Sequence, residues 1–286
     1  MLFRSVAHRR DDVAVPALVV AGWHDVFLRG SLASAARSRN PRDRLVVGPW
    51  AHDDRLSHLV GSANLGLAGN GDPRLFDWAL DFYDAARAGA DPPLPPVRAY
   101  ALGARRWVDL PSWPPPEAAR VAHALRGGTF AAAPDDPVPS LGGRNLLLGA
   151  GGLGFGVVDQ RPVAARDDVL VERIALDEAT LLAGPIVARL RADADGGDAL
   201  WALTLCVEQP DGALHNLADG VAAGAGELAV ELGDAFALLP AGAALVLLVA
   251  GSSHPRWPRP SRARRQAVGP GSCLELTVAP AGLAGV

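Results

Sequence analysis

An aspartate and a histidine each follow a short apolar run and a segment that contains a glycine and a tryptophan. Asp25 follows the run 17–21 in the sequence Gly-Trp-His-Asp, and His52 follows the run 45–47 in Gly-Pro-Trp-Ala-His. A carboxylate hydrogen-bonded to an imidazole fixes the tautomer of the ring and stabilises the imidazolium. These residue types therefore predict general acid–base chemistry, provided that the fold brings the two side chains together.

The elements around this pair predict how they would meet. Both apolar runs are rich in Val and Leu, and near-continuous apolar runs of this length are typical of buried parallel strands. The segment 28–40 between them has helical composition, so the region predicts a strand–helix–strand unit. Reacting groups in open α/β sheets lie just outside the carboxyl ends of the strands. Taken singly, Asp25 would be a turn or helix cap and His52 a solvated loop residue.

The order Asp before His matches the end of the order Ser…Asp…His in α/β-hydrolases, but the nucleophile is missing. No serine in the sequence has Gly at both the second position before it and the second position after it, the pattern of a nucleophile elbow. Ser253 has Gly251 before it but Pro255 after it, and Ser31 falls in the predicted helix. The sequence thus holds a base and its partner without the group that they activate.

Several segments resemble the cocaine esterase/X-Pro dipeptidyl-peptidase group of serine hydrolases. Residues 15–32 (VPALVVAGWHDVFLRGSL) and 44–52 (RLVVGPWAH) resemble the part of those proteins that carries the Asp and His. Further stretches resemble the family's C-terminal jelly-roll domain; they are 134–143, 158–161, 166–170, 183–185 and 252–256. The stretches 193–199, 219–222 and 254–260 depart from the family pattern, which puts the family's inter-domain contacts in doubt more than its sandwich.

The resemblance implies a partial α/β-hydrolase followed by a jelly-roll β-sandwich. It assigns His52 as general base and acid, Asp25 as its partner, and Phe27 as a residue of the acyl pocket. Trp23 and Trp50 either line the same pocket or pack in the core beneath the sheet edge. The family's nucleophilic Ser, oxyanion-hole donors and most of its sheet lie in a longer N-terminal part, and this sequence begins after it.

Two functions follow as alternatives. The chain is the C-terminal portion of a serine hydrolase, inactive alone, that acts on a small ester or peptide substrate once a nucleophile-bearing N-terminal half completes it. Alternatively, it is a non-enzymatic jelly-roll binding or interaction module, or a decayed gene fragment. An open reading frame upstream that encodes a Gly-x-Ser-x-Gly elbow would favour the enzyme.

The sequence changes character at the Pro-rich stretch 91–96 (DPPLPP), which predicts domains at 1–92 and 93–286. Before it, 72–89 predicts a helix whose apolar stripe packs on the sheet; the stripe contains Leu75, Trp78, Ala79, Phe82 and Ala86. After it, short apolar runs alternate with Gly, Pro and Asp, which is typical of a β-sandwich or jelly roll.

Charge, hydropathy and cysteine content limit the classes of partner and the compartment that we expect for this protein. The net charge of −4 gives no reason to expect nucleic-acid binding, and the apolar run 241–251 is too short to span a membrane and reads as a buried strand. No signal-peptide pattern opens the sequence, so we expect a soluble, cytoplasmic protein, with self-association left open. Cys206 and Cys273 fall in apolar runs, which favours reduced thiols over a disulfide. No motif indicates a metal or another cofactor, and the remaining histidines, His24 among them, read as surface or loop residues.

Overall fold

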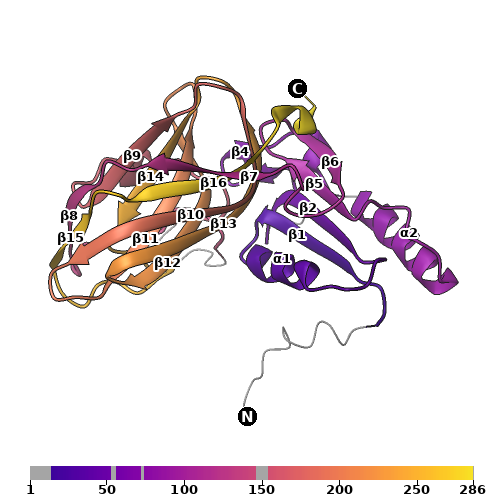
Figure 1. Cartoon of the computed structure of the whole chain (residues 1–286), viewed down its shortest axis with the longest axis horizontal. Coiled ribbons are helices and arrows are strands. Elements are labelled where there is room, and N and C mark those ends of the chain that lie inside the picture. The colour runs from indigo at the N-terminus through magenta and orange to yellow at the C-terminus, as the bar shows by residue number, and fades with distance from the viewer. Residues whose placement is uncertain (1–13, 53–55, 72–73, 146–153, 286) are drawn as a thin grey trace, which may run out of the picture.

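The computed structural model describes residues 14–52, 56–71, 74–145 and 154–285. Figure 1 shows two parts side by side: a small sheet with two helices at the right, and larger sheets built from later strands at the left. This division confirms the predicted change from α/β to almost pure β structure. Beyond residue 97 the described chain contains only short helices, α3 (Arg161–Ala164) and the 3-10 helix η3 (Ala281–Ala284).

The predicted strand–helix–strand unit is present. Strand β1 (Leu18–His24), helix α1 (Leu28–Ala36) and strand β2 (Arg44–Ala51) follow one another, and the two strands are parallel neighbours. Every residue of β2 is buried, which explains its unbroken apolar run. Strand β1 lies at one edge of the sheet, whose order is β1-β2-β5-β6.

The sheet that begins with β1 continues past the predicted domain boundary at residue 92. Strand β5 (Val97–Ala101) pairs in parallel with β2, and β6 (Arg106–Leu110) pairs antiparallel with β5. The α/β part therefore continues through Leu110. The Pro-rich stretch is a short connection into the third strand of the same sheet. Local composition cannot show which distant strand pairs with which, so the sequence did not predict this continuation.

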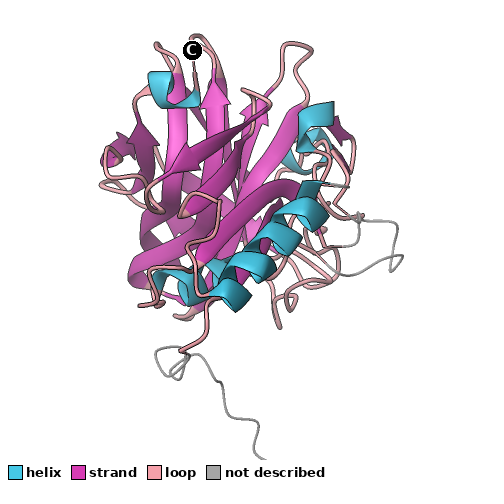
Figure 2. Cartoon of the chain, turned by 90° about the vertical axis from the view of Figure 1, so that its right-hand side faces the viewer, coloured by secondary structure: helices cyan, strands magenta, loops and turns pink. Residues whose placement is uncertain are grey.

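The predicted helix at 72–89 is α2 (Arg74–Ala88), which lies on the outer surface and faces the viewer in Figure 2. The predicted apolar stripe is the more buried side of this helix: Phe82 is buried and the other stripe residues are half-buried. On the other side, Phe76, Leu80 and Tyr83 repeat at helical spacing and are 64 %, 63 % and 64 % exposed. This helix thus presents an apolar face to solvent.

Short elements follow β2 in the α/β part: strands β3 (Leu59–Val60) and β4 (Ala63–Asn64) form a small hairpin, and a 3-10 helix, η2, spans Leu67–Gly69. None of the helices in the described part of the chain is both long and apolar enough to cross a membrane.

The second part consists of two antiparallel sheets. One has the order β7-β16-β10-β15-β8, with β13 also paired to β10; the other has the order β12-β11-β14-β9. Their bounds are β7 (Ala119–Ala124), β8 (Gly128–Ala132), β9 (Val169–Ala175), β10 (Thr180–Ala194), β11 (Ala199–Glu208), β12 (Leu214–Gly224), β13 (Gly226–Leu239), β14 (Ala244–Ala250), β15 (Arg264–Val268) and β16 (Cys273–Ala279).

Side-chain alternation shows where this core lies. Along β10, Ala188 and Leu190 are buried while Arg189 and Arg191 are exposed, which is the period of a strand with one solvated face. Strand β14 is buried at every residue, as predicted for the apolar run 241–251, because β11 and β9 flank it. The fold class is thus an α/β part followed by a larger β part; the jelly-roll topology stays a prediction.

The two parts are joined by backbone pairing and by aromatic packing. Leu102, at the end of β5, accepts from the backbone N–H of Leu238 at 2.8 Å and donates to Phe236 at 2.9 Å. The indole of Trp23 lies 5.0 Å from that of Trp113 and 6.4 Å from the ring of Phe236, measured between ring centroids. The end of β1, which precedes Asp25, is therefore anchored against the second part.

Candidate active site

A bulge in β2 brings Asp25 and His52 opposite each other. The register of β1 against β2 pairs Gly22 with Gly48 but His24 with Ala51, so β2 contains one extra residue over this interval. With the earlier register, Asp25 would face Ala51. The extra residue places His52 beside Asp25, although 27 residues separate them in sequence.

The glycine and tryptophan residues of this region explain the bulge. A Cβ on Gly22 would lie 2.2 Å from the carbonyl oxygen of Trp50, and a Cβ on Gly48 would lie 2.4 Å from the Trp50 indole. Only glycine permits both approaches. The repeated Gly/Trp context in the sequence is therefore packing that shapes the strand ends.

The geometry of the pair suits proton transfer. A carboxylate oxygen of Asp25, Oδ2, lies 3.2 Å from Nδ1 of His52. The other, Oδ1, accepts the backbone N–H of Phe27 at 2.8 Å, which fixes the carboxylate at the start of α1. Because an ionised carboxylate only accepts, the hydrogen bond places the proton of a neutral imidazole on Nδ1 and leaves Nε2 as the base. The His52 side chain is 40 % exposed, so a reactant can reach the imidazole.

Phe27, which the family resemblance assigns to an acyl pocket, lies next to the histidine. Its ring contacts the imidazole of His52 edge-on, with 5.0 Å between ring centroids, and the residue is 55 % exposed. An exposed aromatic ring beside a solvent-facing base offers an apolar wall to a substrate.

The two tryptophans are core residues in this structure. Trp23 is 1 % exposed and donates its indole N–H to the carbonyl of Tyr100 at 2.8 Å. Trp50 is 2 % exposed and donates to the carbonyl of Gly69 at 2.7 Å. Of the two predicted roles, this burial favours core packing, because the rings are covered and the only polar group of each is hydrogen-bonded.

No nucleophile is placed at the pair within the described part of the chain. The only hydrogen-bond partner of His52 there is Asp25. Cys206 is buried, and this burial raises the pKa of its thiol well above the ordinary value, which makes it a poor nucleophile. Cys273 is half-buried, and neither cysteine forms a disulfide in the structure.

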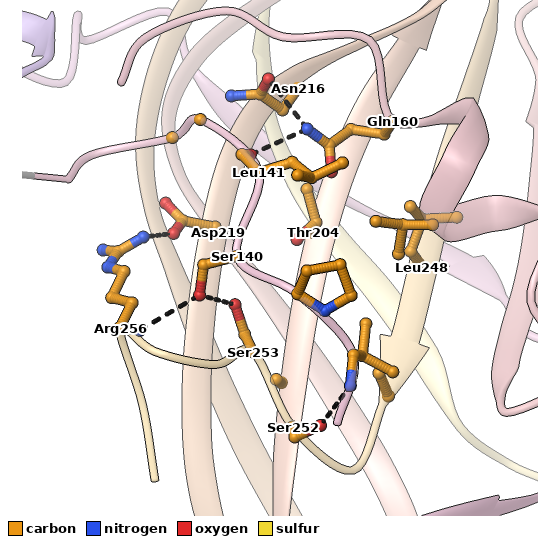
Figure 3. A pocket seen from close by; sticks show the side chains of 17 residues that line it. Ser140, Leu141, Gln160, Thr204, Asn216, Asp219, Leu248, Ser252, Ser253 and Arg256 are labelled. Carbon is orange, nitrogen blue, oxygen red and sulfur yellow. Dashed lines mark hydrogen bonds and ion pairs between the residues drawn. The ribbon is translucent and has the colours of Figure 1, made fainter. Parts of the chain in front are cut away.

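Ser253 belongs to a polar cluster in the β part, shown in Figure 3. Its hydroxyl pairs with that of Ser140 at 2.8 Å, and the hydroxyl of Ser252 accepts the backbone N–H of Val138 at 2.9 Å. The cavity between these groups is about 30 Å³, room for roughly a water molecule. The segments 134–143 and 252–256, singled out in the sequence, thus meet each other in a structural network.

Residues 88–277 match the family described as the X-Pro dipeptidyl-peptidase C-terminal non-catalytic domain, and residues 3–54 match the X-Pro dipeptidyl-peptidase S15 family. The chain belongs to the X-Pro dipeptidyl-peptidase family. It is 31 % identical over 249 residues to cocaine esterase from Rhodococcus sp. (strain MB1 Bresler), a match that covers 76 % of this chain and 42 % of that protein. The family is one of hydrolases that includes this esterase.

Solved structures show the same fold. An aminopeptidase from a marine sediment Thaumarchaeota archaeon superposes with a TM-score of 0.79 at 22 % identity, over 94 % of this chain and 56 % of its own. An α-amino acid ester hydrolase gives 0.75 at 21 % identity, over 92 % and 55 %. This chain therefore spans about half the length of the relatives that it matches.

Two buried ionisable residues, His24 and Arg144, were not predicted as such from the sequence. His24, expected at the surface, is 3 % exposed because β1 runs into the junction of the two parts, and its Nε2 has no hydrogen-bond partner among the described residues. Arg144 is also buried, and its guanidinium donates to backbone carbonyls of both parts. Single-residue types cannot reveal such burial, because it depends on contacts between distant segments.

The burial of His24 makes stability depend on pH. Burial, and the nearby Arg144 cation, lower the pKa of its imidazole to about 3 in the folded chain, against about 6.5 when unfolded. Protonation below pH 6.5 therefore favours the unfolded state. The neutral His24 imidazole contributes its full stabilisation above pH 6.5, and this stabilisation is lost as pH falls toward 3. We expect the free energy of unfolding to fall by about 2 kcal/mol from this residue between pH 7 and pH 5.

The measurement is urea unfolding at both pH values for the wild type and for His24→Phe. Carboxylates whose pKa is lowered by folding, such as Asp159 and Glu275, affect both proteins equally and cancel in the difference. The same pH dependence in both proteins would show that the imidazole of His24 is not kept neutral by the fold.

Proposed function

We propose that this chain supplies the base and its partner to a serine hydrolase that cleaves small esters or amides through an acyl-enzyme. Nε2 of His52 takes the proton of the serine hydroxyl and later returns one to the leaving group, while Asp25 holds the ring and stabilises the imidazolium. The contact of 3.2 Å between Nδ1 of His52 and Oδ2 of Asp25 carries the proposal. The esterase and peptidase names of the relatives support the reaction class.

The serine comes from a segment outside this sequence. Strand β1 has one neighbour, β2, in the described sheet, so its outer edge has room for a further strand. Phe76, Leu80 and Tyr83 of α2 are also exposed. We propose that the segment with the nucleophile elbow extends the sheet from the free edge of β1 and ends near His52.

Fluorophosphonate labelling tests this proposal. The chain alone is expected to take up no label, because a His–Asp pair without a nucleophile forms no acyl-enzyme. Co-expression with the polypeptide encoded directly upstream is expected to give stoichiometric label on a serine of that polypeptide. Label on a serine of the present chain would instead identify a complete enzyme of another design.

A second candidate is a non-catalytic binding role for the β part. It is favoured by the match of residues 88–277, most of the chain, to a domain described as non-catalytic. Failure of every upstream polypeptide to restore labelling, with the chain still folded, would favour this role or a decayed gene.

A further inference from the structure

A cavity of about 580 Å³ lies at the junction of the two parts, and its lining contains neither Asp25 nor His52. Its wall comes from the end of β1, the β3–β4 hairpin, the β5–β6 turn, strands β11 and β12, and the end of β13. Such a volume falls in the range of small-molecule sites, about 300–1,000 Å³. The cavity of Figure 3, by comparison, holds about one water.

Most of the wall is apolar. The apolar lining residues are Ala63, Leu65, Leu102, Val157, Val207, Leu217, Ala237, Leu238, Leu239 and Pro240. Asn216 and Ser62 also line the cavity, but their side chains already bond to the backbone, with Asn216 Nδ2 donating to Gly156 at 3.0 Å and Ser62 Oγ donating to Val157 at 2.9 Å. An apolar body is therefore the natural occupant of most of this volume.

Of the remaining polar side chains in the lining, which are His24, Asn64, Arg105, Gln209 and His215, two matter most for the choice of ligand: one is buried and one carries a full charge. Nε2 of His24 is buried in the wall without a hydrogen-bond partner among the described residues. A buried unpaired nitrogen of this kind costs about 1–3 kcal/mol, which a ligand group could recover. Arg105, in the exposed β5–β6 turn, forms no hydrogen bond or ion pair in the described part of the chain, and the described lining contains no Asp or Glu.

We propose that this cavity binds a small amphipathic monocarboxylate. The carboxylate pairs with the Arg105 guanidinium at the mouth, the apolar chain fills the space between Leu65, Leu102 and Leu217, and a hydroxyl or amide of the ligand hydrogen-bonds to Nε2 of His24. This assignment is independent of the hydrolase role proposed for Asp25 and His52.

The charges of the wall decide between ligand classes. A metal ion or a cationic ligand would meet an arginine and no carboxylate in the described lining. A wholly apolar ligand would leave both Arg105 and His24 unpaired. A monoanion with an apolar body is the class that satisfies the cation, the buried nitrogen and the hydrocarbon wall together.

Calorimetric titration with octanoate and octanamide tests the charge. Octanoate is expected to bind the full chain about 2- to 5-fold more tightly than octanamide, since a pair with an exposed arginine contributes at most about 1 kcal/mol. Arg105→Gln is expected to remove this preference. Arg106→Gln is the matched control: it removes an equal charge from the neighbouring residue, which does not line the cavity, and should change octanoate binding by less than about twofold.

The role of His24 is tested with ω-hydroxyoctanoate. Its hydroxyl is expected to increase the affinity by about 2- to 10-fold over octanoate in the wild type, the range of one net hydrogen bond, and His24→Phe should abolish the gain. Leu238→Trp, which fills the cavity from β13, should abolish binding of all these ligands. Thermal unfolding of each variant verifies that it is folded.

Several outcomes would overturn the proposal. Absence of octanoate binding to the wild type at several millimolar would exclude the site. Equal affinity for octanoate and octanamide would exclude the carboxylate class, and binding unaffected by Leu238→Trp would place the ligand elsewhere. An unchanged hydroxyl gain in His24→Phe would exclude the assigned partner of that hydroxyl.

Discussion

His52→Ala is expected to abolish turnover and fluorophosphonate labelling in the completed enzyme, in which an upstream polypeptide supplies the serine. The loss in kcat should reach about 10⁶-fold, because base and nucleophile act as a unit and removing the base costs nearly as much as removing the whole triad. The substitution also removes the imidazole that lies 3.2 Å from Oδ2 of Asp25 and that contacts the ring of Phe27.

Asp25→Asn separates the role of the carboxylate from that of the ring. The amide keeps the shape of the side chain, but its NH₂ group can donate to Nδ1 and so stabilise the tautomer with the proton on Nε2. That tautomer cannot accept the serine proton, and a loss of about 10⁴-fold in kcat is expected. Oδ1 still accepts from the Phe27 N–H, so the fold around α1 should be retained.

The control is His123→Ala, which removes an imidazole from β7 in the other part of the molecule. Its kcat and labelling should equal those of the wild type. Full labelling of His52→Ala, with the unfolding transition of the wild type, would refute the proposed base, whereas loss in all three variants would point to failed assembly of the two polypeptides.

Local patterns were sufficient for the elements and for the pairing of Asp25 with His52. Strand–helix–strand topology places the ends of β1 and β2 together, so the order of apolar runs predicts the meeting of residues 27 positions apart. The sequence did not reveal that the meeting depends on a bulge in β2. That bulge follows from the packing of Trp50 on Gly48, and the hydrophobic periodicity of the sequence does not predict this contact.

Long-range choices were not predictable in the same way. The Pro-rich stretch 91–96 indicates a break in helical structure, but only the register shows that β5 returns to β2. The burial of Trp23 and His24 has the same origin, because the second part covers the end of β1. The lining of the cavity at this junction is spread over the sequence from residue 24 to residue 240, so no local motif could have predicted it.

Arg144 is expected to be the residue of the junction whose loss most destabilises the fold. Its Nε donates to the carbonyl of Trp23 at 3.0 Å, Nη1 to Leu232 at 2.8 Å and Nη2 to Asp234 at 2.7 Å. The first carbonyl belongs to β1 and the other two to β13, so one side chain ties the two parts together. Burial lowers its pKa to about 10, while the neighbouring Asp234 carboxylate favours the charged form.

Arg144→Met should lower the free energy of unfolding by about 3–5 kcal/mol. Methionine replaces most of the volume, but it removes the donor from three carbonyls, two of them in buried hydrogen bonds and one in a part-buried hydrogen bond. A buried carbonyl left unpaired costs about 1–3 kcal/mol. A fully apolar replacement of an ion pair can be neutral, yet that requires removal of both partners, and backbone carbonyls cannot be removed. Arg144→Lys keeps the charge but has no planar fork, so it should recover only part of the loss.

Urea unfolding measures this difference, with Arg173→Met as the matched control. Arg173 pairs with Glu208 at 2.6 Å on the surface of the β part, where its side chain is 54 % exposed. An exposed pair contributes at most about 1 kcal/mol, so the same chemical change should have little effect there. A free energy of unfolding for Arg144→Met within about 1 kcal/mol of the wild type would mean that water reaches the carbonyls of Trp23, Leu232 and Asp234, and that aromatic packing alone holds the two parts together.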